Sequence, residues 1–82
     1  MAQWTIKAEY DGEAGVWYVI DADVPGLWAD AETLEALERK IGPMILDLLE
    51  INADFITDRD RLVGPHNVRI IAHHERAFDL AA

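Results

Sequence analysis

Residues 10–37, YDGEAGVWYVIDADVPGLWADAETLEAL, decide the fold of this chain. They begin with a turn, in which Asp11 can bond its own backbone and two glycines reach positive φ at little cost. Residues 16–20 are all β-branched or aromatic, so they predict a β-strand with little exposure on either face. A tight bend follows, because Pro25 fixes φ and Gly26 suits the turn position that needs positive φ.

Another strand precedes this segment. Residues 4–10 alternate between apolar and polar side chains, which predicts a half-buried strand that pairs antiparallel with the next one. Its apolar face carries Trp4, Ile6, Ala8 and Tyr10. Strict alternation in the strand at 16–22 predicts one face with Val16, Tyr18, Ile20 and Ala22 and the other with Trp17 and Val19. Residues 27–31 predict a short third strand, antiparallel to the second.

An amphipathic helix is expected after the third strand. Thr33 is the predicted N-cap, because its hydroxyl can accept a hydrogen bond from an amide of the first turn. An apolar stripe at spacings of three and four residues comprises Leu34, Leu37, Ile41, Met44, Ile45 and Leu48. Pro43 cannot bond the carbonyl of Arg39, so it predicts either a kink or two helical pieces, and the unbroken stripe favours a kink. Asn52 is expected to end the helix.

The remaining residues complete a single domain over 1–82. Residues 53–65 carry little pattern, apart from a charge run and a turn signal at Gly64-Pro65. Residues 68–75 alternate as a fourth strand, and residues 77–82 are expected to form a fraying last turn. The predicted fold class is α+β: a three-stranded antiparallel meander, a crossover helix kinked near Pro43, and a fourth strand that joins the sheet parallel to its neighbour.

Charge limits the partners that the domain can bind. Its formal net charge is −9, and residues 1–53 hold 11 acids against three bases. Nucleic-acid affinity comes mostly from lysine and arginine that neutralise phosphates, so direct nucleic-acid binding is not expected. A basic protein is the natural complement, since opposite potentials speed association. The alternative is that the acids only keep a small protein in solution.

No segment predicts membrane insertion or export. No run approaches the roughly 20 apolar residues of a membrane helix, and the N-terminus lacks the regions of a signal peptide. The chain has no cysteine, which excludes disulfides, thiolate metal sites and cysteine nucleophiles. A cytoplasmic location is therefore expected.

Metal binding and catalysis are not expected. His73 and His74 are adjacent, so on a strand they point to opposite faces, and His66 follows a turn. Four acids lie near strand ends: Glu9, Asp11, Asp21 and Asp23. They belong to different faces and loops, whereas a nuclease site needs carboxylates that converge on a divalent cation. We predict no catalytic, cofactor or metal site, and no enzyme activity.

Trp17, Val19 and Trp28 are the candidate residues for a partner or oligomer interface. Aromatic side chains dominate binding energy where they are buried at the centre of an interface. The acids around these three residues suit a basic partner. The alternative is that they are ordinary core residues, above all Trp17.

The same stretches resemble the HicB-like antitoxin family of bacteria. The matching residues, in order, are Asp11–Trp17 (DGEAGVW), Val24–Leu27 (VPGL) and Ala31–Leu37 (AETLEAL). Residues 41–52, with Pro43 inside, are most similar to a short, uncharacterised branch of that family. The resemblance covers about residues 4–52.

This resemblance implies a βββα(β) arrangement like a partial ribonuclease-H fold without nuclease activity. It implies a module that neutralises a small basic mRNA-cleaving toxin, HicA-like, and that forms a homodimer or higher homo-oligomer. Many family members carry a C-terminal DNA-binding module, which is not found in this sequence, so repression of an operon is not carried over. The alternative is an orphan self-associating structural domain with no toxin partner.

Overall fold

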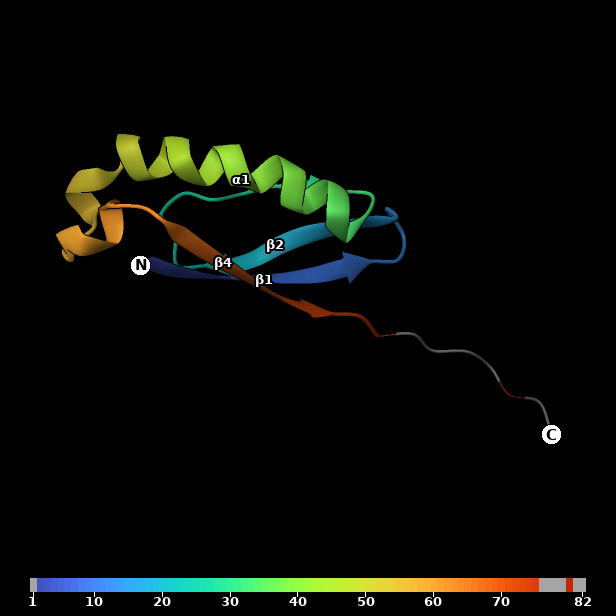
Figure 1. The fold of residues 1–82 in the computed structure, drawn as a ribbon. Coiled ribbons are helices and arrows are strands. Elements are labelled where there is room, and N and C mark those ends of the chain that lie inside the picture. Colours follow the sequence, from blue (N-terminus) through green and yellow to red (C-terminus); the bar gives the residue numbers. More distant parts are fainter. Residues whose placement is uncertain (1, 76–79, 81–82) are drawn as a thin grey trace.

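The computed structural model of the chain describes residues 2–75 and Leu80, and the rest of the tail predicted at 77–82 lies outside the described residues. The elements confirm the predicted βββαβ order (Figure 1). They are β1 (Ala2–Asp11), β2 (Val16–Ala22), β3 (Asp30–Ala31), α1 (Leu34–Ile51) and β4 (His66–His73). The strands form one sheet, and α1 lies across one of its two faces (Figure 1).

The sheet is mixed, with the strand order β3-β2-β1-β4. β1 pairs antiparallel with β2 and parallel with β4, as the sequence predicted for a crossover strand. The parallel pairing sets Ile6 beside Ile70, and parallel strands need a long connection. That connection consists of α1 and two short 3-10 helices, Ala53–Phe55 and Arg59–Leu62.

An irregularity between β1 and β2 corrects the predicted faces of the second strand. Lys7 pairs with Asp21, but Ala8 pairs with Val19, so Ile20 is an extra residue in β2. Such a bulge shifts the alternation of side chains by one position. Ala22 therefore packs against the same core as Val19, whereas strict alternation predicted opposite faces for these two residues.

The third strand is shorter than the predicted 27–31. Only Asp30 and Ala31 form β3, which pairs with β2, although the N–H of Val19 also donates to the carbonyl of Ala29 at 3.1 Å. The preceding residues turn their apolar side chains into the core, because Leu27 and Ala29 are both buried. The backbone of this segment thus follows the side of the helix rather than the edge of the sheet.

Both ends of α1 form as predicted. The Thr33 hydroxyl accepts a hydrogen bond from the Ala36 N–H at 3.0 Å, which makes it the N-cap. Asn52 is the C-cap, and its side-chain amide donates to the Pro25 carbonyl at 3.2 Å. This contact ties the end of the helix to the predicted bend, where Gly26 has a φ of 80°.

Pro43 lies inside a single helix, so the alternative of two helical pieces is wrong. Proline clashes with the backbone and Cβ of the residue before it when that residue is helical. Here the preceding residue is Gly42, which has no Cβ. Pro43 is solvent-exposed, so the carbonyl that it leaves without an intrahelical partner can bond water.

The core lies between α1 and the helix-facing side of the sheet. From the helix it takes Leu37, Ile41, Ile45 and Leu49, and from the strands Trp4, Ile6, Ala8 and Val19. Leu49, one residue beyond the end of the predicted stripe, is buried as well. Full burial of each large apolar side chain stabilises the fold by roughly 1.5–3 kcal/mol. Within residues 2–75 and Leu80, no helix is both long enough and apolar enough to cross a bilayer.

The charge run at 57–61 contributes to the fold. The Arg61 guanidinium lies 3.9 Å from the centre of the fully buried Trp4 ring, a cation–π arrangement. It also donates to the Gln3 carbonyl at 2.8 Å and to Asp23 at 3.2 Å. Arg61 thus fastens the crossover to the start of β1. The predicted turn at Gly64-Pro65 leads into β4 through a cis peptide bond.

Candidate protein-binding surfaces

The structure separates the three candidate interface residues. Val19 is 1% exposed and belongs to the core beneath α1, so it is not available to a partner of the folded domain. Trp17 is half-buried and packs against the same core. Trp28 is 69% exposed, in the segment between β2 and β3. Of the three, Trp28 alone has the exposure that a binding residue needs before its partner arrives.

Trp17 belongs to an aromatic cluster beside the turn that joins β1 and β2. Its ring centre lies 5.3 Å from that of Tyr10 and 5.7 Å from that of His74, in tilted and edge-on arrangements. Such pairs contribute about 0.5–1.5 kcal/mol beyond their buried area. The cluster therefore holds the ends of β1, β2 and β4 together.

The sheet face turned away from α1, here called the outer face, is covered by no second layer of the described residues (Figure 1). Tyr18 lies on it, opposite Glu9 of β1 and Asp30 of β3. Ile20, in the bulge, is 45% exposed. Trp28 lies beside this face rather than on it, in the segment that leads to β3, and its side chain is exposed between the buried Leu27 and Ala29. Two exposed or half-buried apolar groups of β2 thus lie near an exposed tryptophan at the β3 edge.

Three acids and one lysine lie on this face, and a second lysine, Lys40 of α1, lies 3.9 Å from the Asp30 carboxylate. Glu9, Asp21 and Asp30 share the outer face of β1, β2 and β3, where Lys7 is paired with Asp21. The Tyr18 hydroxyl donates to the Glu9 carboxylate at 3.3 Å. Burial and, after it, the charge of Glu9 raise the pKa of Tyr18 above its ordinary 10.0. We call Tyr18, Ile20, Trp28, Glu9, Asp21 and Asp30 the acidic patch.

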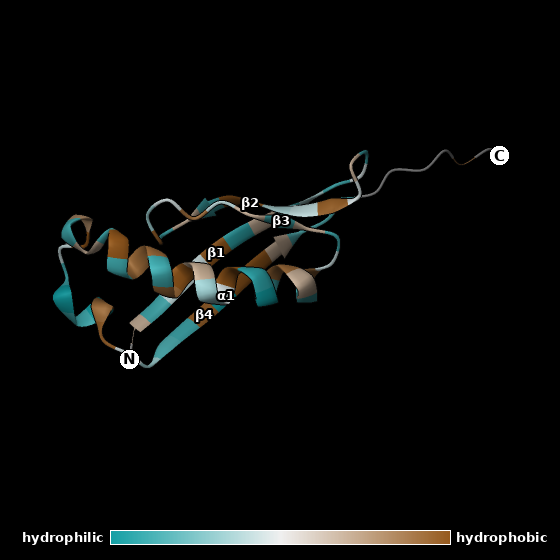
Figure 2. Cartoon of the chain, turned by 90° about the horizontal axis from the view of Figure 1, so that it is seen from above, coloured by the Kyte–Doolittle hydropathy of each residue, from teal (hydrophilic) through white to brown (hydrophobic). Residues whose placement is uncertain are grey.

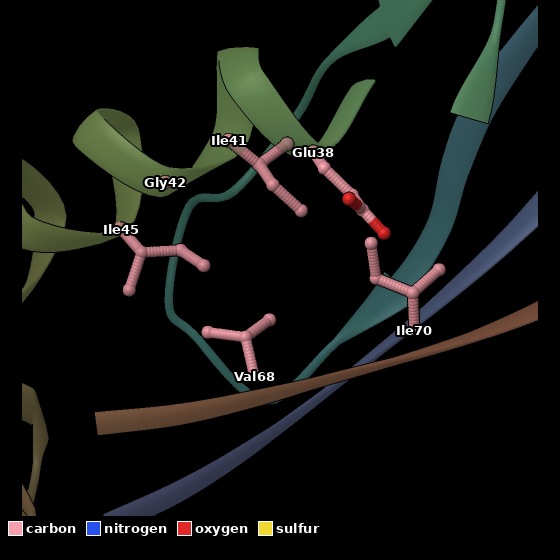
Figure 3. Close-up of a pocket in the computed structure, with 6 residues that line it drawn as sticks. All are labelled: Glu38, Ile41, Gly42, Ile45, Val68 and Ile70. Carbon is pink, nitrogen blue, oxygen red and sulfur yellow. The ribbon is translucent and has the colours of Figure 1, made fainter. Parts of the chain in front are cut away.

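A groove runs along the other side of the molecule, between α1 and β4. α1 lies closer to β2 and β3 than to β4, which leaves the helix-facing side of β4 poorly covered. The resulting cavity of about 380 Å³ is lined by Glu38, Ile41, Gly42, Ile45, Val68 and Ile70 (Figure 3). Val68 and Ile70 point towards the helix in this view (Figure 3). A Cβ atom added at Gly42 would meet no heavy atom of the described residues within 4 Å.

A second cavity, of about 340 Å³, continues the groove towards the start of β4. It is lined by Leu46, Leu49, Glu50, Ala53, Leu62 and His66. The Nδ1 atom of His66 accepts a hydrogen bond from the Trp4 indole at 3.1 Å, so His66 has a structural role in the core. We call both cavities together the α1–β4 groove. In Figure 2 both α1 and β4 alternate between hydrophobic and hydrophilic residues, and the groove is lined by apolar side chains together with Glu38, Glu50 and His66.

Two acids at strand ends have structural roles. Asp11 accepts hydrogen bonds from the amides of Glu13 and Ala14, and Asp23 from the amide of Thr5. The Nε2 atom of His73 lies 3.4 Å from a carboxylate oxygen of Glu75, and both side chains are exposed. Among the described residues, no three histidines or acids lie close enough together to hold a metal ion.

The sequence predicted neither the outer face nor the α1–β4 groove as the structure forms them. Tyr18 and Ile20 were assigned to one face, but nothing in the sequence said that this face lies outward. The open flank of β4 had a signal, since Val68 and Ile70 alternate with polar residues in a strand at the end of the chain. That pattern predicts a half-buried strand, and the lateral position of α1 decides how much of it is covered.

Comparison with known proteins identifies the family of this chain. Residues 3–74 match the model of a family described as a domain of unknown function, DUF1902. The chain belongs to the DUF1902 family. A solved structure of this fold is that of hypothetical protein TTHA1013 from the extremely thermophilic bacterium Thermus thermophilus, 37% identical in sequence. It superposes with a TM-score of 0.72, over 93% of this DUF1902 chain and 99% of the other. The comparison with curated proteins gave no match.

Proposed function

We propose that this DUF1902 domain is a HicB-like, antitoxin-type binding module that neutralises a small basic mRNA-cleaving toxin. The observation that carries the proposal is the acidic patch, an uncovered sheet face with Glu9, Asp21 and Asp30, together with the exposed Trp28 two residues before Asp30. The resemblance of residues 4–52 to HicB-like antitoxins gives the class of partner. The module works by binding in the cytoplasm, without catalysis or a cofactor.

Physical chemistry supports a basic partner at this patch. An exposed tryptophan provides a large rigid contact area, and interface hot spots are enriched in tryptophan and tyrosine. The carboxylates would raise the association rate of a basic protein at low salt. Covering the RNA-binding surface of the toxin with acids would block its access to mRNA, since that surface must itself attract phosphates.

The proposal is tested by identifying and then titrating the partner. The tagged protein is purified gently from its native cells, and a stoichiometric small basic protein is expected in the mass spectrum. That protein, purified, should cleave mRNA, and the domain should stop the cleavage at a one-to-one ratio. Co-expression of the domain should restore growth that the toxin arrests. A tagged chain that emerges only with itself, under several growth conditions, would contradict the proposal.

Variants locate the interaction. Trp28→Ala should weaken binding of the basic protein at least tenfold, because it removes the exposed anchor of the acidic patch. Phe55→Ala is the matched control, since Phe55 is also an exposed aromatic residue, at 77%, but lies in the 3-10 helix Ala53–Phe55 and lines neither cavity. The control should bind like the wild type, and both variants should melt within a few degrees of it.

A second candidate function is an orphan self-associating structural domain without a toxin. The α1–β4 groove favours it, because this open apolar surface is separate from the acidic patch. The two functions share the fold and self-association, and differ in whether a basic protein binds.

A further inference from the structure

We infer that β4 and the α1–β4 groove form a homodimer interface, in which β4 of a second copy pairs antiparallel with β4 across a two-fold axis at Ile70. Self-association is part of both proposed functions, and this inference adds the surface and the register. It does not depend on the existence of a toxin.

The first argument is the open edge of β4. In the described chain this strand of eight residues pairs with β1 along one side only, so the N–H and C=O groups along its other side lack a strand. Natural proteins protect such edges with proline, lysine, bulges or very short strands. β4 has no proline, no lysine and an unbroken register with β1 over its whole length. Arg69, the only arginine of β4, alternates onto the outer face with Thr5, so the backbone groups of the edge are open to another strand.

The second argument is the apolar surface beside that edge. Val68 is 39% exposed, although it lies opposite the fully buried Trp4 on the helix-facing side of the sheet. A strand added to β4 would extend the floor of the groove, and every second side chain of it would enter the space beside Ile41 and Ile45 (Figure 3). The occupant must therefore be a strand with apolar residues at alternate positions, which β4 itself is.

The third argument identifies the occupant by its charge. The chain has a net charge of −9, yet residues 61–74 contain no acid, two arginines and three histidines. Two acidic copies can therefore approach each other along this strand without opposing carboxylates. Glu38 and Glu50, on the helix wall of the groove, would then lie above the uncharged side chains of Val68, Ile70 and Ala72, while Arg69 and His73 lie on the outer face. A second copy is the partner that fits both the pattern and the charge.

The register follows from symmetry. A two-fold axis perpendicular to the sheet keeps both helices on the same face, so paired residues must come from the same face of each strand. A centre at Arg69 would set two guanidinium groups directly opposite each other, which is unfavourable. A centre at Ile70 sets Ile70 against itself, Val68 against Ala72 and Arg69 against Ile71. Apolar side chains of both copies then meet under the two helices.

Cysteine cross-linking tests this register, because the chain has no cysteine of its own. Paired residues of antiparallel strands lie about 4.5–5.5 Å apart at Cα, within the range of a disulfide. Oxidised Ile70→Cys protein should therefore migrate largely as a dimer on a non-reducing gel. Asn67→Cys is the matched control: position 67 would pair with position 73, so its two copies would be about 20 Å apart and should not cross-link.

A mixture of Val68→Cys and Ala72→Cys proteins provides a second test, at exposed positions. It should give a mixed disulfide in preference to either homodimer. The wild-type protein should sediment as a dimer at tens of micromolar. A wild-type monomer at 100 μM would overturn the interface, and Asn67→Cys cross-linking as readily as Ile70→Cys would overturn the register. Neither measurement involves a toxin, so each can fail while the proposed function stands.

Discussion

The two edges of the sheet differ in length, charge and covering. The β3 edge has two residues, and beside it Lys40 of α1 donates to the Asp30 carbonyl at 2.6 Å. The β4 edge has eight residues and no acid. A groove separates it from α1, whereas α1 packs against the β3 side of the sheet. The short acidic edge is unsuited to strand pairing and exposes Trp28, whereas the long edge offers backbone groups and apolar pockets. The basic protein and the second copy that we propose as partners would therefore use different edges of the sheet.

The largest expected effect contrasts the packed and open sides of α1. Leu37→Ala removes a side chain with no exposure and should lower the free energy of unfolding by about 2–5 kcal/mol. Val68→Ala, at the open groove, should lower the free energy of unfolding of the monomer by less than about 1 kcal/mol for each methyl group removed. The reason is that the Val68 side chain is already partly in water. Urea denaturation at low protein concentration measures both. Equal losses would mean that the groove is closed in solution.

Pro43→Ala changes the helix beside the groove wall. Proline in a helix interior costs about 3 kcal/mol relative to alanine, and part of this is offset because proline restricts the unfolded chain. Since Pro43 is exposed, the variant should raise the free energy of unfolding by about 2 kcal/mol. Thermal unfolding followed by circular dichroism would detect the change. A variant less stable than the wild type would show that the helix requires its present shape.

A pair of variants should separate the two surfaces. Val68→Lys places a charge in the groove and should weaken self-association about tenfold, or 1.4 kcal/mol, while leaving basic-protein binding unchanged. Trp28→Ala should do the reverse. Sedimentation equilibrium and titration calorimetry measure the two affinities. If either variant lowered both, the surfaces would be coupled and the contrast between the edges would fail.

The smallest effect concerns Tyr18 on the acidic patch. Its raised pKa means that the folded state favours the neutral phenol, so this contribution to stability is complete below pH 10 and is lost as the pH rises through the folded pKa. Ultraviolet absorbance during a base titration should show one of the two tyrosines ionising later than an ordinary one. Glu9→Gln should lower that pKa in part, because burial is the larger cause. No change would mean that the contact with Glu9 at 3.3 Å is absent in solution.

Local chemistry explains which features the sequence predicted correctly. The hairpin turn, the Gly26 bend and the Thr33 and Asn52 caps each depend on a few neighbouring residues, and all of them form. The bulge at Ile20 was missed because it depends on the pairing of β2 with β1, and no glycine or proline marks it.

The candidate surface was predicted only in part, for a tertiary reason. Both faces of β2 are apolar, so the sequence could not tell which of them α1 covers. Val19 became core and Trp28 stayed exposed once the helix had packed on one side. The groove likewise depends on the lateral position of α1 over the sheet, which no local pattern encodes.

The parallel pairing of β1 with β4 has a consequence for how the chain folds. The Trp4 indole donates a hydrogen bond to His66, which is 62 residues away in sequence. β1, which is synthesised early, therefore gains its second neighbouring strand only when β4 has been made. Proteins dominated by such distant contacts fold slowly, because the entropy of closing the chain is lost before the contacts form. During synthesis, β1 must wait with one side uncovered until residues 66–73 have left the ribosome. A nascent chain that stalls before that point exposes Trp4 and an unpaired strand, the form that chaperones and proteases recognise.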